Sequence, residues 1–254
     1  MIPNQRKEKI LELIKEDGAA KVVDLARIFK VTEVTIRQDL EKLEKEGVIV
    51  REHGGAYIKN VETQVRTVSL AHQENMDQKE LIAQKSIEFI QNGDTIILDS
   101  GSTTTEIAKK LKGFKNLTVI TNALNVALII GAQPGIEVVV TGGEFKPPTL
   151  SLTGQKAADF FKGLHVQKLF LATAGISLKA GLTYPSISDL VVKKAMIDAA
   201  ETTYLVADST KIGKSAFASL GALSLINYII TDSGIEEKHK QLFKDNEIEL
   251  IIAS

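Results

Sequence analysis

From residue 76 onward, short apolar runs alternate with longer amphipathic runs, and this alternation is the feature that most constrains the fold. The runs TIIL, EVVV and LFLA are almost wholly apolar, as expected of strands that are covered on both faces of a sheet. Segments with helical spacing of their apolar residues lie between such runs. Strands that alternate with helices in this way predict an α/β domain with a mostly parallel sheet.

The expected elements of this region follow from the same pattern. We place strands at 95–99, 117–121, 136–141, 167–173, 203–208, 227–231 and 248–252. Helices are expected near 76–91, 103–111, 123–130, 155–162, 188–201 and 235–245. In an open α/β sheet, ligands bind beyond the carboxyl ends of the strands. Residues that follow those strands are therefore the first candidates for a ligand site.

The first 58 residues have a different organisation. Helical spacing predicts three short helices at 4–16, 21–29 and 33–46, with Thr32 as the N-cap of the third and Gly47 at its end. The stretch 48–58 then reads as a two-stranded wing with its turn at 53–55. We therefore expect a winged helix-turn-helix domain at 1–58, a polar linker at 59–75 and an α/β domain at 76–254.

The third helix of such a domain presents its N-terminal face to the DNA major groove. The apolar residues Ile36, Leu40 and Leu43 point inward, which leaves the polar side chains outside. The candidate DNA-binding residues are Thr32, Thr35, Arg37, Gln38 and Lys42, with Arg51, His53 and Gly54 in the wing. Residues 1–60 carry 12 basic and 11 acidic residues, so charge alone does not predict nucleic-acid binding. A solvated surface or a protein-contact domain has the same pattern.

The stretch LDSGSTTTEIAKKL at 98–111 has the form of an anion-binding turn. Asp99 ends a predicted strand, and Gly101 allows close approach of a ligand to the backbone because it has no Cβ. Ser102, Thr103 and Thr104 bring hydroxyl groups to a helix N-terminus, where free N–H groups and the helix dipole favour an anion. The same residues also suit an ordinary N-cap.

Other small or polar residues follow neighbouring strands. Asn122 follows 117–121, a Gly-Gly pair follows 136–141, and ADSTKIG lies at the end of the strand expected at 203–208. Lys193 lies near the start of a predicted helix, where a cation is unfavourable to the dipole unless solvent or an anion compensates it. Its neighbour Lys194 is expected to be solvated. The Gly- and Pro-rich loop at 142–154 is a candidate segment to close over a ligand.

Composition excludes several classes of site. The chain has no cysteine, so disulfides, thiol catalysis and Cys-based metal sites are excluded, and a cytoplasmic protein is expected. The four histidines are far apart in sequence, so we expect no metal and no cofactor. No apolar run approaches the roughly 20 residues that cross a bilayer, and the N-terminus lacks the apolar core of a secretory signal.

The segment VTEVTIRQDLEKLEKEGVIVREHGGA at 31–56 closely resembles the DNA-binding signature of the DeoR family of bacterial transcriptional regulators. The segments GDTIILDSGSTTTEIA, TVITNALNVA, GGEFKPPTLSLTG, GLTYP, VKKAMI and ADSTKIG resemble the effector-binding domain of the same family. The resemblance implies a larger domain of the sugar-phosphate-isomerase-like type, similar to ribose-5-phosphate isomerase. It also implies phosphorylated sugars or related metabolites as effectors.

Carried over to this chain, the resemblance implies an effector site at the strand ends. Its phosphate loop is Asp99, Gly101, Ser102, Thr103 and Thr104, with Thr121, Asn122, Gly142 and Gly143 alongside and Lys193, Asp208 and Lys211 lining the rest. Three departures stand out. Gln38 replaces a usual arginine, while the stretches 172–175 and 186–189 lack polar groups that the family often has.

The expected function is that of a homo-oligomeric repressor, a dimer or tetramer, that binds double-stranded operator DNA and senses a phosphorylated sugar. Activation and co-repression stay open as alternatives. The rival prediction is an active isomerase with a DNA-binding module. Isomerisation needs a carboxylate base beside the substrate carbonyl, but Ala174 stands where the isomerases have an acidic residue. We therefore expect a sensor and not an enzyme.

Overall fold

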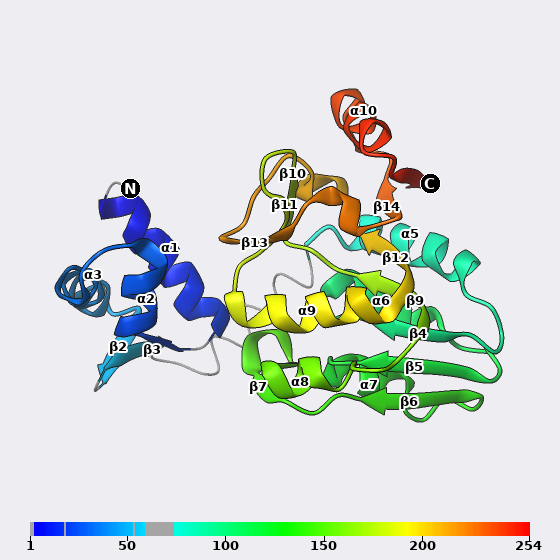
Figure 1. Cartoon of the computed structure of the whole chain (residues 1–254), viewed down its shortest axis with the longest axis horizontal. Helices are drawn as coiled ribbons and strands as arrows, with labels where there is room; N and C mark the ends of the chain where they lie inside the picture. The colour runs from blue at the N-terminus through cyan, green and yellow to red at the C-terminus, as the bar shows by residue number, and fades with distance from the viewer. Residues whose placement is uncertain (1–2, 18, 53, 59–73) are drawn as a thin grey trace. The chain divides into compact units, whose positions relative to one another are not determined.

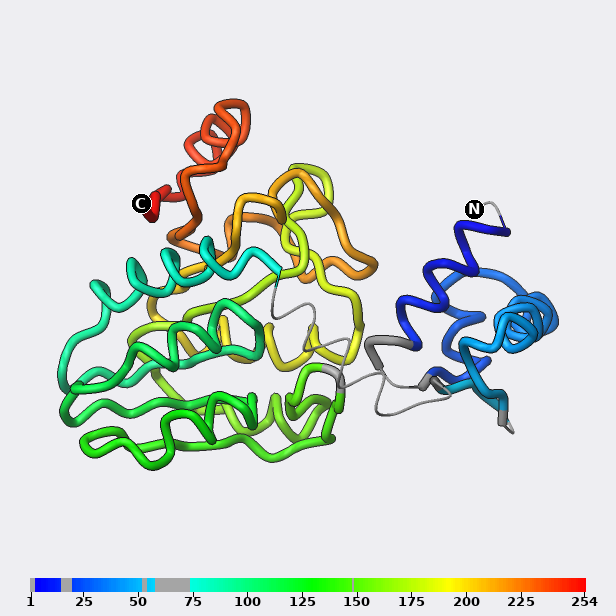
Figure 2. Tube along the Cα trace, turned by 180° about the vertical axis from the view of Figure 1, so that it is seen from behind, coloured from blue at the N-terminus to red at the C-terminus, as the bar shows by residue number. Residues whose placement is uncertain are grey.

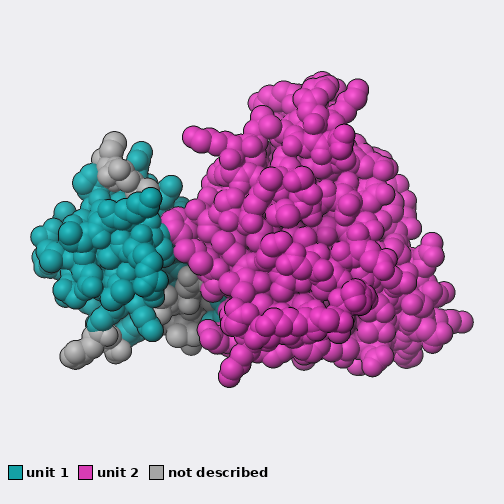
Figure 3. Space-filling model, viewed as in Figure 1, with its two compact units in different colours: residues 1–71, 146–148 teal, residues 72–145, 149–254 magenta. Residues whose placement is uncertain are grey.

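A computed structural model describes residues 3–17, 19–52, 54–58 and 74–254 of the chain. The chain divides into two compact units, residues 1–71 with 146–148 and residues 72–145 with 149–254 (Figure 3). Most of the predicted linker, 59–73, lies outside the described residues. The limits expected for the two domains, 1–58 and 76–254, stay a prediction.

The first unit contains the three predicted helices α1 (Pro3–Asp17), α2 (Val22–Phe29) and α3 (Glu33–Lys45). Their buried side chains form a small apolar core that includes Ile10, Ile14, Leu25, Ile36 and Leu40. Lys30, in the left-handed conformation at φ 52°, ends α2. The turn is short because Thr32 then caps α3, with its side chain accepting a hydrogen bond from the Thr35 N–H at 3.3 Å.

Both predicted wing strands within 48–58 are present and paired, and a third strand that was not predicted joins them from before α2. β1 (Ala19–Lys21), which precedes α2, pairs antiparallel with β3 (Gly55–Ile58), and β3 pairs with β2 (Ile49–Glu52). A Cβ at Gly55 would lie 2.6 Å from the carbonyl oxygen of Ala20. This close approach explains the second glycine of the wing turn. β1 was not predicted because three residues are too few to show an alternating pattern. Its partner β3 is also distant in sequence.

The second unit is built on a seven-stranded sheet whose order is β15-β14-β12-β9-β4-β5-β6 (Figure 1). Every neighbouring pair in it is parallel, as the alternating pattern predicted. The strands are β4 (Thr95–Leu98), β5 (Leu117–Thr121), β6 (Ile136–Val140), β9 (Val166–Leu171), β12 (Ala200–Val206), β14 (Tyr228–Asp232) and β15 (Glu249–Ala253). All seven expected strands are present, with small shifts at their ends.

Helices cover both faces of this sheet. α5 (Met76–Ser86), α6 (Ser102–Lys110) and α7 (Leu124–Ile130) contribute to one buried apolar cluster and lie on the face seen in Figure 2. α8 (Gln155–Asp159), α9 (Ile187–Ala199) and α10 (Glu237–Asp245) contribute to the other cluster. Short 3-10 turns are η1 (Ile87–Phe89), η2 (Pro147–Thr149), η3 (Ser209–Lys211) and η4 (Leu223–Leu225). The all-parallel sheet is thus sandwiched between helices, which fixes where its strand ends emerge.

Two small sheets, separate from the parallel one, were not predicted. β10 (Gly175–Ser177), β11 (Gly181–Tyr184) and β13 (Ala218–Gly221) form one, and β7 (Glu144–Lys146) pairs with β8 (Ser151–Thr153) in the other. Each strand has three or four residues, too few to show an alternating pattern. Among the described residues, no helix has the length and apolar character that a membrane crossing requires.

Candidate DNA-binding and effector sites

The solvent side of α3 carries the predicted DNA contacts. Arg37, Gln38 and Lys42 are exposed, and Thr35 is half-buried beside the capping residue Thr32, with 3.0 Å between the two hydroxyl oxygens. Ile36, Leu40 and Leu43 are buried on the opposite side. The helix therefore separates an apolar side from a polar side as the sequence predicted, while the DNA-binding role of each residue stays a prediction.

Arg37 and Arg51 are both engaged in ion pairs. The Arg37 guanidinium lies 2.7 Å from the carboxylate of Glu33, one turn earlier on α3. Arg51, on β2, pairs with Glu44 at 3.3 Å and donates a hydrogen bond to the Arg37 carbonyl at 3.4 Å. These contacts hold the wing arginine against the recognition helix. Gly54 is exposed at the wing turn, and His53 lies outside the described residues.

A buried ion pair between α1 and α3 escaped the sequence reasoning. The Arg6 Nε donates to Asp39 Oδ2 at 2.6 Å, and a second nitrogen donates to Oδ1 at 3.3 Å. Their side chains are 10% and 4% exposed. Two parallel hydrogen bonds from one guanidinium fix both distance and orientation. The pair thus fixes the orientation of α3 on α1. The available sequence signal was Asp39, an acidic residue on the otherwise apolar, buried side of α3.

In the second unit, the predicted effector residues gather at the carboxyl ends of the parallel strands. Asp99 follows β4, Thr121 ends β5, and Asp208 follows β12. Gly142 and Gly143 follow β6, next to β5, where the Thr141 N–H donates to the Thr121 carbonyl at 3.1 Å. Because all these strands are parallel, their carboxyl ends lie along one edge of the sheet.

Lys193 reaches this edge from α9 and contacts an anion of the protein itself. Its Nζ lies 2.5 Å from Asp99 Oδ2, and it lies 4.7 Å from the centre of the Tyr184 ring. The Tyr184 hydroxyl donates to the Ala172 carbonyl at 2.8 Å. Contrary to the sequence interpretation, Lys193 is in the middle of α9 and not near its start. Asp99, and not the helix end, is thus what compensates its charge.

The carboxylate of Asp99 is completely buried. Burial raises the pKa of Asp99, an effect opposed by Lys193 and by the Ala172 N–H, which donates to Oδ2 at 3.1 Å. Burial and the nearby negative charge of Asp99 also raise the pKa of Tyr184 well above its usual value. Tyr184 therefore stays a neutral donor. The neighbour Lys194 is exposed, as predicted, and pairs with Asp198.

The N-terminus of α6 has backbone donors without a capping side chain. Gly101 is its N-cap residue, and no side chain accepts from its first N–H groups, which have no partner within the helix. The hydroxyls of Thr104 and Thr105 donate back to the Gly101 carbonyl at 3.0 and 2.6 Å. Ser102 is half-buried and Thr103 is buried. The Thr104 and Thr105 hydroxyls are thus occupied within the turn, which leaves its backbone N–H groups and the Thr103 hydroxyl as candidate donors to a ligand.

Gly101 has a packing role that the sequence interpretation did not anticipate. Its φ of 170° is ordinary extended backbone. A Cβ there would lie 2.6 Å from the Cβ of Ala172, which follows the neighbouring strand β9. The glycine is therefore required by the close approach of two strand ends, whether or not a ligand is bound.

Of the four buried side-chain oxygen atoms that lack hydrogen-bond partners among the described residues, two directly follow the neighbouring strands β5 and β6. They are Asn122 Oδ1, after β5, and Thr141 Oγ1, after β6. The Asn122 Nδ2 is occupied, because it donates to the Leu152 carbonyl at 3.1 Å. The Leu152 N–H in turn donates to the Asn122 carbonyl at 2.7 Å, so part of the predicted closing segment 142–154 lies over this edge. Buried polar atoms normally have a partner.

Asp208 forms a second polar cluster at the same edge. It accepts hydrogen bonds from Asn75 at 3.3 Å and from the N–H and hydroxyl of Thr210. Lys79, on α5, is 3% exposed, and burial lowers its pKa although Asp208 favours its charged form. Lys211 is half-buried in η3. Sequence reasoning missed Asn75 and Lys79, whose proximity to Asp208 depends on folding.

The stretches that depart from the family pattern have structural contacts. The Thr173 hydroxyl donates to the carbonyls of Gly175 and Thr183, both at 3.1 Å. Ser186 caps α9 and accepts from the Ser188 N–H at 3.2 Å. The polar side chains of these stretches therefore form hydrogen bonds with backbone groups around the strand ends.

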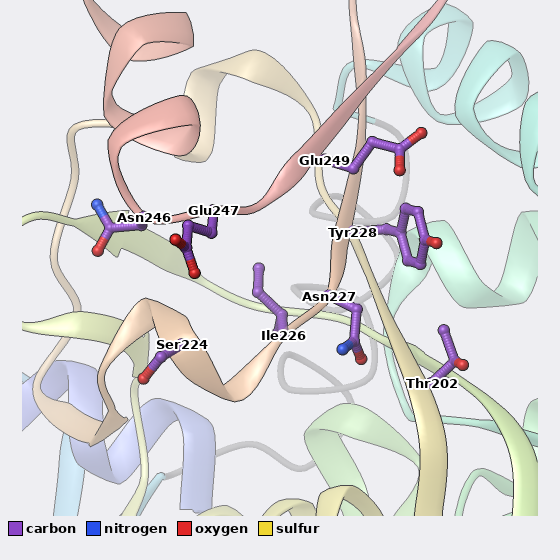
Figure 4. A pocket seen from close by; sticks show the side chains of 8 residues that line it. All are labelled: Thr202, Ser224, Ile226, Asn227, Tyr228, Asn246, Glu247 and Glu249. Atoms are coloured by element: carbon purple, nitrogen blue, oxygen red, sulfur yellow. The ribbon is translucent and has the colours of Figure 1, made fainter.

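Three cavities lie away from the predicted effector residues. The first, of about 450 Å³, is at the amino ends of β12, β14 and β15 (Figure 4). It is lined by Thr202, Ser224, Ile226, Asn227, Tyr228, Asn246, Glu247 and Glu249. The second, of about 400 Å³, lies at the amino ends of β5 and β6, and the third, of about 370 Å³, lies between α8 and α9. The described residues contain no group of three or more His, Asp or Glu side chains that could bind a metal ion.

Comparison with known families matches both parts of the chain. Residues 6–62 match the family described as DeoR-like helix-turn-helix domain. Residues 74–233 match the family described as DeoR C terminal sensor domain. The chain belongs to the DeoR family of transcriptional regulators. The predicted family membership and the predicted fold class of this DeoR-family chain are thereby confirmed.

Curated relatives extend over the whole length of the DeoR-family chain. An uncharacterised helix-turn-helix regulator, YulB of Bacillus subtilis, is 34% identical over 98% of this chain and 96% of its own. The glycerol-3-phosphate regulon repressor of Escherichia coli is 30% identical over 98% and 99%. The family to which the chain belongs is one of helix-turn-helix transcriptional regulators and not of enzymes, which agrees with the expectation of a regulator.

Solved structures resemble part of the chain more distantly. Ribose 5-phosphate isomerase from Plasmodium falciparum covers 53% of this chain and 52% of its own, with 17% identity and a TM-score of 0.39. A similarity of this extent concerns about half of the DeoR-family chain and implies nothing about activity.

Proposed function

We propose that the protein is a repressor of sugar-metabolism genes whose operator affinity changes when a phosphorylated sugar or related metabolite binds the second unit. Two winged helices of a homo-oligomer would contact a palindromic or repeated operator. The names of relatives support this direction, since one is a glycerol-3-phosphate regulon repressor and another is a putative aga operon transcriptional repressor.

The DNA-binding part of the proposal is supported by the surface of α3. Arg37 and Lys42 offer positive charges to phosphates, and Gln38 suits a bidentate contact with adenine. Thr32 and Thr35 lie at the N-terminus of α3, the end that enters the groove in a helix-turn-helix. Arg51, His53 and Gly54 are proposed as backbone contacts from the wing.

The effector part rests on one observation: the unpartnered Asn122 Oδ1 and Thr141 Oγ1 lie at the same sheet edge as the uncapped N-terminus of α6. Free backbone N–H groups at a helix N-terminus suit a phosphate. An amide oxygen accepts only, so Asn122 Oδ1 suits a hydroxyl group of the ligand. A molecule with both groups, such as a sugar phosphate, satisfies both sets of atoms.

The remaining proposed effector residues belong to elements that meet the same edge of the sheet. Ser102, Thr103 and Thr104 lie in the first turn of α6, and Gly142 and Gly143 adjoin Thr141. Lys193, Asp208 and Lys211 add charged groups along the edge. An effector alters DNA affinity only when it binds the two states of the oligomer with different affinities. The linker 59–75 is the proposed route between the units.

A thermal-shift screen of phosphorylated sugars on the full chain tests the effector site. A ligand of this site raises the melting temperature of the wild type and loses its effect in Thr103→Ala. Lys194→Met, a change of an exposed lysine on α9, serves as the control and keeps the effect. Each active sugar is then added to a DNA-binding titration with operator. A ligand that binds tightly but leaves operator affinity unchanged would exclude the proposed regulation.

A further inference from the structure

Val34 is an exposed apolar residue on the recognition helix. It is the second residue of α3, and 60% of its surface is accessible. The helical spacing of three and four residues places it on one face with Arg37 and Gln38, both exposed. Val34 was not among the predicted DNA-binding residues, although the inward positions Ile36, Leu40 and Leu43 already place it outside.

The fold itself gives no reason for valine at this position. Its side chain contributes little to the core, because its surface is mostly accessible while Ile36, two residues on, is fully buried. Valine also has a lower helix propensity than alanine, because its branched Cβ restricts the side chain. A single exposed valine is common on protein surfaces. Its place on the first turn of the helix that enters the groove is what sets it apart.

The major groove offers one apolar group to such a side chain. Each base pair presents its own set of donors and acceptors there, and only thymine adds a methyl group, on C5. Aliphatic side chains recognise thymine through contact with that methyl. A polar base edge, in contrast, would lose its hydrogen bonds to water when valine covers it, and valine offers no hydrogen bond in return.

We infer that Val34 is a specificity-determining residue that recognises the C5 methyl of a thymine in each half of the operator. The inference rests on the proposed operator binding and adds a base contact that carries no charge and no hydrogen bond. Val34 discriminates thymine from cytosine and from uracil. Arg37 and Gln38, on the same face, supply the polar contacts next to it.

The test uses duplexes selected by the full-length wild-type chain from a random-sequence pool. Each thymine of the selected site is replaced by uracil in turn, which removes the methyl group and leaves the hydrogen-bonding edge intact. Affinities are measured by fluorescence anisotropy at one fixed salt concentration, because protein–DNA affinity depends strongly on salt. Loss of one buried methyl contact weakens wild-type binding by about fourfold per half-site.

Val34→Ala supplies the decisive comparison. It binds the thymine duplex more weakly than wild type by about the same factor, and uracil at the sensitive position makes no further difference to it. Its salt dependence matches that of wild type because no charge is lost. Val23→Ala is the matched control: Val23 is 50% exposed on α2, and its variant keeps the uracil sensitivity of wild type.

Several outcomes overturn the inference. Uracil substitutions that affect wild type and Val34→Ala equally, or that affect neither, exclude a methyl contact by Val34. A selected site without thymine does the same. If wild type enriches no duplex at all, operator binding itself fails, and this result is distinguishable because it requires no variant. Circular dichroism melting of Val34→Ala checks that the exposed substitution leaves the fold intact.

Discussion

The Nζ of Lys193 lies 2.5 Å from the Asp99 carboxylate inside the second unit, although 94 positions separate the two residues in the chain. The Asp99 side chain is fully buried and that of Lys193 is 6% exposed. Each charge compensates the other where solvent does not reach. Removal of one partner leaves a buried, uncompensated charge, which typically costs about 3–5 kcal/mol.

Lys193→Met is therefore expected to lower the free energy of unfolding by about 3–5 kcal/mol at neutral pH. Burial raises the pKa of Asp99 in the folded chain, so the folded state holds this proton more strongly than the unfolded state does. The free energy of unfolding therefore decreases through Asp99 as the pH rises from the pKa of this residue in the unfolded chain to its higher pKa in the folded chain. Without Lys193 that pKa rises further, so the deficit of the variant grows with pH.

Urea unfolding of wild type and Lys193→Met at pH 5 and pH 8 measures this difference. Lys194→Met is the control, since Lys194 and Asp198 are about half exposed, and such pairs contribute about 0–1 kcal/mol. A deficit of Lys193→Met that is equal at both pH values, or no larger than that of Lys194→Met, would contradict the role assigned to the pair.

Gly101→Ala is expected to destabilise the second unit by about 1–3 kcal/mol. The new Cβ would lie 2.6 Å from that of Ala172, so one of two adjoining strand ends must move. Thermal melting measures the loss. Gly142→Ala is the matched control, because nothing lies within 4 Å of a Cβ at Gly142, and its melting temperature should stay close to that of wild type.

The sequence was sufficient for the sheet and insufficient for the contacts that complete the site. Near-continuous apolar runs such as TIIL identify strands buried on both faces, and parallel pairing then places Asp99, Asn122 and Asp208 at one edge without knowledge of the strand order. The edge was predictable because it follows from strand direction alone.

Contacts between distant segments were not predictable in this way. The partner of Lys193 is set by how α9 packs against the sheet, which no local pattern encodes. β1 and the small sheet of β10, β11 and β13 have strands of three or four residues and are defined by their pairing partners. The Arg6–Asp39 pair was missed because an arginine in a polar first turn resembles a solvated residue.

That pair leads to a prediction for the first unit. Arg6→Met leaves Asp39 buried without a counter-charge and should cost about 3–5 kcal/mol of unfolding free energy. Operator binding should fall with it, since α3 loses its anchor to α1. Arg27→Met is the control, because Arg27 is 77% exposed beside Asp24.

The double variant Arg6→Met/Asp39→Leu distinguishes a buried charge from a lost side chain. Removing both charges should restore much of the stability, since well-packed apolar pairs replace buried ion pairs at little cost. Circular dichroism melting of the full chain provides the measurement. If the double variant is no more stable than Arg6→Met, the loss of stability comes from the missing side-chain packing of Arg6 and not from the uncompensated charge of Asp39.

The ion pair between Glu33 and Arg37 makes a last prediction about DNA affinity. Both side chains are about half exposed, so the pair contributes at most about 1 kcal/mol, and Arg37 must leave Glu33 to contact a phosphate. Glu33→Gln frees the guanidinium and should raise non-specific DNA affinity by about two- to fivefold at low salt. Arg37→Met should lower affinity for all sequences and reduce the salt slope by about 1.

Anisotropy titrations with a random duplex over a series of salt concentrations test both variants. Glu41→Gln is the matched control, because Glu41 forms the same type of pair, 3.0 Å from Lys45, at the other end of α3. If release of Arg37 is the cause, Glu33→Gln strengthens binding more than Glu41→Gln does, and the gain disappears in Glu33→Gln/Arg37→Met. Equal gains from both glutamine variants would instead indicate a general effect of net charge, because each removes one negative charge from the same helix.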